Sequence, residues 1–188
     1  MKLRLLLALV SIALLAPFAA TAKANAASET VDTNDIPVLG VVYEGSAKRL
    51  SEQANLRAMR HNANPATILA VTRRNGLWLP IRLGYYDANN HGVGYSKACR
   101  GHNYCNVPVM NNITRKGFLE YGGGRYGVEG WILWYNKYGQ VRATVLTRNV
   151  YELKQGHKLP KGMIQGLITA YCKPRGVCPS WINLARPV

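Results

Sequence analysis

Two histidines and a glutamate are the residues of this sequence best suited to acid–base chemistry. His91 and His102 lie in a stretch rich in tyrosine and asparagine, and Glu129 follows further along the chain. Phosphodiester cleavage needs a base, an acid and a cation beside the phosphate, and these residue types could supply them. Their spacing matches no catalytic motif, and solvated loop histidines are common. Catalysis is therefore the alternative interpretation of this set.

A second set of residues could bind a ligand without transforming it. Aromatic rings stack on bases or sugar faces, while lysine and arginine hold phosphate or carboxylate groups. Such residues alternate between Gly84 and Asn106, a stretch of little apolar periodicity that we expect to form a functional loop or short irregular strands. The predicted binding residues are Tyr85, Tyr86, Tyr95, Lys97, Arg100 and Tyr104 from this loop, together with Arg125.

The spacing of the four cysteines favours disulfide bonds over metal ligation. Five residues separate Cys99 from Cys105, and five separate Cys172 from Cys178, which is not the C-x2-C spacing of a structural zinc site. Turn-forming residues lie within each loop, so we predict the local pairs Cys99–Cys105 and Cys172–Cys178. A crossed pairing that closes a much longer loop is the alternative. We predict neither a metal nor a cofactor.

The N-terminus has the layout of a secretory signal peptide. Basic residues at Lys2 and Arg4 precede an apolar run, and small residues follow as far as Ala26. The apolar run is too short to span a bilayer as a stable helix, so a retained anchor is the weaker alternative. We expect residues 1–26 to be removed, residues 27–37 to form a flexible arm, and residues 38–188 to form one secreted or periplasmic domain.

The chain is strongly basic, with 24 lysines and arginines against nine acidic residues and a formal net charge of +15. Removal of residues 1–26 would leave a net charge of +12, spread along the chain rather than concentrated in a tail. Such a field attracts anionic partners, namely nucleic acid, cell-envelope polymers or acidic polysaccharides. A basic surface that serves only solubility is the simpler alternative.

Two segments are predicted to form β-hairpins. Residues 128–153 contain two apolar and aromatic runs around a turn at Asn136–Gly139, and residues 67–83 contain two such runs around Asn75–Gly76. Short strands are predicted at 107–115 and 118–121. Helices are predicted at 47–62 and 163–171, and a strand at 167–171 competes with the second helix.

Together these elements predict an α+β domain, in which an antiparallel sheet built from hairpins carries one or two short helices and is stabilised by disulfides. The function that we expect is binding of an anionic polymer or glycan by a secreted or periplasmic protein, such as a toxin-like or envelope-acting factor. The alternative is a secreted hydrolase that acts on a phosphodiester or cell-wall polymer through His91, His102 and Glu129. A purely structural envelope protein is the third possibility.

Overall fold

The computed structural model describes residues 35–44 and 64–188. Three predictions made from the sequence fall wholly or mostly on other parts of the chain. The signal peptide at 1–26 and the helix at 47–62 lie outside the described residues, as does the arm at 27–37 except for its last three residues.

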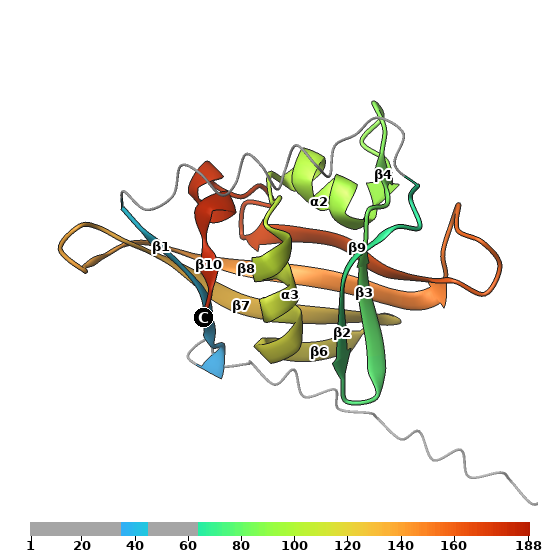
Figure 1. The fold of residues 1–188 in the computed structure, drawn as a ribbon, viewed down its shortest axis with the longest axis horizontal. Coiled ribbons are helices and arrows are strands. Elements are labelled where there is room, and N and C mark those ends of the chain that lie inside the picture. The colour runs from blue at the N-terminus through green and yellow to red at the C-terminus, as the bar shows by residue number, and fades with distance from the viewer. Residues whose placement is uncertain (1–34, 45–63) are drawn as a thin grey trace, which may run out of the picture. The chain divides into compact units, whose positions relative to one another are not determined.

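Three long antiparallel strands form the greater part of the main sheet (Figure 1). β7 (Arg125–Tyr135) and β8 (Val141–Gln155) are antiparallel neighbours, as predicted for residues 128–153. The turn between them depends on Asn136, whose side-chain oxygen accepts hydrogen bonds from the backbone N–H groups of Tyr138 and Gln140. β9 (Ile164–Lys173) extends the sheet beyond β8.

The opposite side of β7 is shared by two strands. β6 (Phe118–Gly122) pairs antiparallel with the first half of β7, whereas β1 (Val38–Tyr43) pairs parallel with the second half. β10 (Arg186–Pro187) pairs with β1 and completes six strands. The sheet is therefore mixed, and the antiparallel sheet predicted from hairpins is found only in part, because β1 pairs parallel with β7. No local turn joins β1 to β7, so the sequence between them does not set their relative direction.

The second predicted hairpin lies outside the main sheet. β2 (Ile68–Arg74) and β3 (Leu77–Arg82) are joined at Asn75 and Gly76, both of which have positive φ, as a two-residue hairpin turn requires. Figure 1 shows this hairpin beside α3 (Val107–Lys116), in front of the main sheet.

The helix α3 corrects the strand predicted at 107–115. Asn106 caps the helix, because its side-chain oxygen accepts a hydrogen bond from the N–H of Val109, and proline is present in the first turn. Val109, Met110 and Ile113 then fall on one face, where all three are completely buried. Burial of this face against the sheet outweighs the weak strand preference of the β-branched residues.

The region 84–106, predicted to be irregular, contains two short strands and a helix. β4 (Tyr85–Tyr86) pairs with β5 (Gly92–Val93), and α2 (Gly94–His102) follows directly.

The segment 163–171 is part of the strand β9 and not a helix, in agreement with the competing interpretation. Gly166 has a φ of +73°, and a Cβ atom there would lie 2.3 Å from the carbonyl oxygen of Pro80. The close approach of β3 to β9 at this point therefore requires a glycine at position 166.

The two predicted local disulfides, Cys99–Cys105 and Cys172–Cys178, are confirmed. The loops that they close also contact each other. His102 Nδ1 lies 2.8 Å from the carbonyl oxygen of Gly176, and the N–H of Cys178 donates to the carbonyl oxygen of His102. The paired loops connect the end of α2 to the end of β9, before the 3-10 helix η2 (Ser180–Leu184).

α3 packs on the sheet over a core that includes a buried polar network. Thr114 Oγ1 donates to the carbonyl oxygen of Met110 and lies 2.6 Å from the hydroxyl of Tyr151. Asn149 Nδ2 donates to the same carbonyl oxygen and to Thr114 Oγ1. Thr114, Asn149 and Tyr151 are completely buried, so their partners must come from within the protein.

No helix in the described part of the chain is both long enough and apolar enough to cross a membrane.

Replacement of Thr114 by valine should lower the free energy of unfolding by about 1–3 kcal/mol, because Tyr151 and Asn149 each lose a buried partner. Urea denaturation followed by circular dichroism measures the change. Thr144→Val, the same substitution at an exposed position on β8, is the control and should change stability by less than about 0.5 kcal/mol. Equal effects of the two substitutions would contradict a role for the network.

Candidate anion-binding site

The candidate site lies on the face of the main sheet that is turned away from α3, which we call the outer face. Val128, Gly130 and Ile132 of β7 point toward the helix layer, since a Cβ atom at Gly130 would touch Ile113. Alternation along the strand places Glu129 on the outer face. The strand register then aligns it with Arg148 of β8 and Tyr171 of β9. The outer face of β6, β7, β8 and β9 comprises Phe118, Glu120, Arg125, Gly127, Glu129, Trp131, Leu133, Tyr135, Thr144, Leu146, Arg148, Val150, Thr169, Tyr171 and Lys173.

Four charged side chains form an ion cluster in the middle of the outer face. Arg148 Nη1 donates to Glu129 Oε1 at 2.5 Å and to Glu120 Oε2 at 2.7 Å. Lys173 Nζ pairs with the same oxygen of Glu129. The Glu129 side chain is only 3% exposed, so these two cations replace the water that its carboxylate would otherwise bind.

The ion cluster also fixes the charge state and position of Arg148. Burial alone lowers the pKa of Arg148, but its hydrogen bond to Glu129 and the charges of Glu129 and Glu120 outweigh burial, so the net shift is upward. Gly127 gives the guanidinium room, because a Cβ atom at that position would lie 2.5 Å from Nη2 of Arg148. Arg148 is thus held flat against β7.

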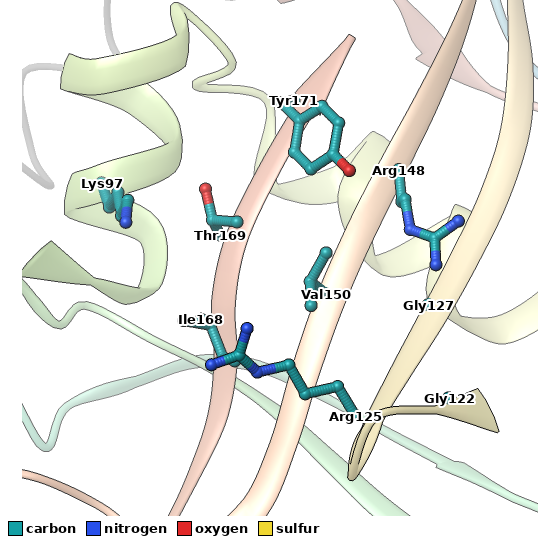
Figure 2. Close-up of a pocket in the computed structure, with 9 residues that line it drawn as sticks. All are labelled: Lys97, Gly122, Arg125, Gly127, Arg148, Val150, Ile168, Thr169 and Tyr171. Carbon is teal, nitrogen blue, oxygen red and sulfur yellow. The ribbon is translucent and has the colours of Figure 1, made fainter. Parts of the chain in front are cut away.

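A cavity of about 430 Å³ opens beside Arg148, and we call it the basic pocket. Figure 2 shows Arg125 reaching from β7 across β8, and Lys97 pointing toward the same hollow from α2. The hydroxyl of Tyr171 points toward Arg148. The pocket is lined by Lys97, Gly122, Arg125, Gly127, Arg148, Val150, Ile168, Thr169 and Tyr171.

Two of the three cations in the basic pocket are available to a ligand. Within residues 35–44 and 64–188, neither Lys97 nor Arg125 has an acidic group within salt-bridge distance. Thr169 Oγ1 is buried in the wall without a hydrogen-bond partner among the described residues. The pocket therefore offers two free positive charges, the hydroxyl of Tyr171 and the guanidinium of Arg148, whose charge is already paired, and the two free charges suit an anionic group.

The predicted binding residues are distributed over several places in the structure. Lys97 and Arg125 meet in the basic pocket. Tyr95 and Tyr104 are core residues, 2% and 0% exposed, and burial raises the pKa of Tyr95 to about 12. Arg100 is exposed on α2 and does not line the pocket.

Tyr85 and Tyr86 are half-buried on the β4–β5 hairpin. The ring of Tyr85 lies 4.3 Å from Lys158 Nζ and faces His157, both in the loop between β8 and β9. The Tyr86 hydroxyl donates to Asn90 Oδ1.

The predicted catalytic residues occupy three different environments. His91 is exposed on the β4–β5 turn, 4.0 Å from Asp87. His102 is bonded to the carbonyl oxygen of Gly176, and Glu129 is held in the ion cluster. No hydrogen bond or ion pair joins any two of the three in the part of the chain that the structure describes.

Sequence reasoning missed Arg148, Thr169, Tyr171 and Lys173. Their alternation along β8 and β9 marks one face, but the register that brings them beside Glu129 has no local signal. Among the described residues, no group of three or more histidine, cysteine or acidic side chains could hold a metal ion. No protein-family model, curated protein or solved structure matches this chain.

Glu129→Gln should lower the free energy of unfolding by about 3 kcal/mol, because Arg148 and Lys173 lose the charge that compensates their partial burial. Thermal and urea unfolding measure the loss. Glu44→Gln removes an exposed carboxylate 3.8 Å from Arg142 and should cost less than about 1 kcal/mol. If Glu129→Gln lowers the free energy of unfolding as little as Glu44→Gln does, the ion cluster does not stabilise the fold.

His102 should make folding stability fall in mild acid. Burial, the largest cause, and the nearby charge of Lys97 lower the pKa of His102, against the opposing effect of the Gly176 carbonyl. As the pH falls below the unfolded value of about 6.5, the unfolded chain takes up the proton first. This contribution to stability is therefore complete above about pH 6.5 and is lost toward the folded pKa.

Urea midpoints measured at about pH 7.5 and about pH 5.5 test this pH dependence. His102→Gln should reduce the difference between the two midpoints, whereas His91→Gln, at an exposed position, should leave it unchanged. An unchanged difference in His102→Gln would show that other groups cause the acid sensitivity.

Proposed function

We propose that this protein binds an anionic polymer or glycan through the basic pocket. One observation carries the proposal: Lys97 and Arg125 both line a cavity of about 430 Å³. Neither residue has an acidic partner among the described residues. Arg148 forms one wall of this cavity, where Glu129 and Glu120 hold its guanidinium in position and compensate its charge. A ligand gains more from a cation that is already in position than from one that it must order itself.

The charge distribution of the described residues supports an anionic partner. They contain 17 lysines and arginines but only six acidic residues. Three of the acidic residues, Glu44, Glu120 and Glu129, are already in ion pairs with lysine or arginine. The remaining field is positive and would speed the association of a negatively charged polymer.

The export expected from the sequence supports the same proposal. Two disulfide bonds are compatible with an oxidising location outside the cytosol. Together with the signal peptide expected at 1–26, they favour a secreted or periplasmic protein that meets cell-envelope polymers, acidic polysaccharides or nucleic acid there. A toxin-like or envelope-acting factor fits this description.

Hydrolysis of a phosphodiester or cell-wall polymer is the alternative function. His102 favours it, because a proton on Nδ1 directed at the carbonyl of Gly176 leaves Nε2 as a base, and its ring lies 5.8 Å from that of Tyr171. Glu129 is less suited to acid–base work, because Arg148 and Lys173 occupy its carboxylate. Degradation of a polymer by the wild type and not by His102→Gln would establish this alternative.

The double substitution Lys97→Ala with Arg125→Ala should weaken binding of polyanions about tenfold or more, since charge-assisted hydrogen bonds are each worth about 1.5–3 kcal/mol. Fluorescence anisotropy with labelled RNA and with labelled acidic polysaccharide, at low and at physiological salt, measures the affinity. The salt dependence should also become less steep, because fewer counterions are released.

Arg175→Ala with Arg186→Ala is the matched control. Both residues are exposed and lie outside the basic pocket, and the pair removes the same net charge. Equal losses in the two double variants would mean that binding depends on overall charge and not on the pocket.

A further inference from the structure

The outer face continues beyond the ion cluster into an aromatic end. Trp131, Leu133 and Tyr135 follow Glu129 at alternate positions of β7 and share its face. Val41 and Tyr43 of β1 pair with Leu133 and Tyr135. The rings of Tyr43 and Tyr135 stack at a centroid distance of 5.4 Å, and Tyr43 is 50% exposed. Among the described elements, α3 and the β2–β3 hairpin lie on the opposite side of the sheet (Figure 1).

The basic pocket and the aromatic end lie at opposite ends of β7. Arg125 is the first residue of β7 and Tyr135 is the last. At about 3.3 Å per residue, the two side chains are separated by about 33 Å along β7. A ligand that contacts both must therefore be extended and several units long.

The charges along this path are unevenly distributed. Free cations are present at the pocket end, where Lys97 and Arg125 lie. In the middle, Arg148 and Lys173 are neutralised by Glu120 and Glu129. The aromatic end, as defined by Val41, Tyr43, Trp131, Leu133 and Tyr135, contains no charged side chain.

This distribution of charge matches an extended ligand that has an acidic group at one end and neutral rings elsewhere. A nucleic acid carries a phosphate on every nucleotide and would place several of them over glutamates, with no free cation beneath. An acyl chain would have to cross the ion cluster, where buried charges offer it no apolar contact. Sugar rings avoid both problems, because their hydroxyl groups tolerate the polar middle and their apolar faces can stack on tyrosine.

We propose that the outer face binds an acidic oligosaccharide lengthwise along β7, with its acidic group in the basic pocket and its neutral sugar rings at the aromatic end. This inference rests on the proposed function, because it needs Lys97 and Arg125 to hold the acid. To the proposed function it adds the class of the ligand, the direction in which the ligand lies along β7, and a second contact region at Tyr135 and Tyr43.

Calorimetric titration with cello-oligosaccharides that carry one terminal uronic acid tests the proposal. Two lengths are used: a disaccharide, which reaches only the pocket, and a chain long enough to span the outer face. The wild type should bind the long chain more tightly. Tyr135→Ala should lower the affinity for the long oligosaccharide about tenfold and leave the affinity for the disaccharide unchanged. Lys97→Ala should lower the affinity for both.

Matched variants separate stacking from damage to the fold. Tyr121→Ala removes a tyrosine that is 67% exposed on the other face of the sheet and should not change either affinity. Tyr43→Ala, at the edge of the sheet, should reproduce the loss seen with Tyr135→Ala. Tyr135→Phe keeps the ring and should retain most of the affinity. Urea unfolding of each variant verifies that it is folded.

The outcomes separate this inference from the proposed function. If Tyr135→Ala and Tyr43→Ala do not change the affinity for the long oligosaccharide, the proposal of lengthwise binding is wrong, but binding at the basic pocket is not contradicted. If single-stranded RNA of the same length binds more tightly and loses affinity in Tyr135→Ala, the ligand is nucleic acid and the class proposed here is overturned. If Lys97→Ala and Arg125→Ala change the affinity for neither oligosaccharide, the proposal that the basic pocket binds the ligand is wrong.

Discussion

The buried carboxylate of Glu129 is the constraint on which the outer face depends. A carboxylate with a side chain 3% exposed is stable only if cations replace its water, and Arg148 and Lys173 do so from the two neighbouring strands. The same contacts hold Arg148 flat over Gly127, where it forms one wall of the basic pocket. One ion cluster thus stabilises the sheet, shapes the pocket and neutralises the middle of the face.

The two faces of the main sheet have different roles because strand residues alternate. On β8, Asn149 and Tyr151 point into the layer under α3 and complete its polar network. Arg148 and Val150, their neighbours in sequence, point the other way and line the pocket. The inner face therefore holds the core under α3, while the outer face holds the ion cluster and the pocket, so substitutions at Lys97 or Arg125, outside both the core and the ion cluster, can test function without dismantling the core.

The two disulfides matter to the site through α2. Cys99–Cys105 closes the end of α2 and Cys172–Cys178 closes the end of β9, and the bond between His102 and the Gly176 carbonyl joins the two loops. This arrangement holds Lys97 beside β9, far in sequence from Arg125 and Arg148. The crosslinks therefore restrain the position of Lys97, a proposed binding residue, as well as the chain.

The sequence was sufficient to predict the features that nearest neighbours control: the Asn75–Gly76 turn, the β7–β8 pair and both local disulfides. It also singled out Lys97 and Arg125. The folded structure was needed to establish that 107–115 is a helix, that 163–171 belongs to a strand and that β1 runs parallel to β7. It alone placed Tyr95 and Tyr104 in the core and Arg148 beside Glu129. These outcomes depend on burial and strand register between distant segments, which no local pattern of residues encodes.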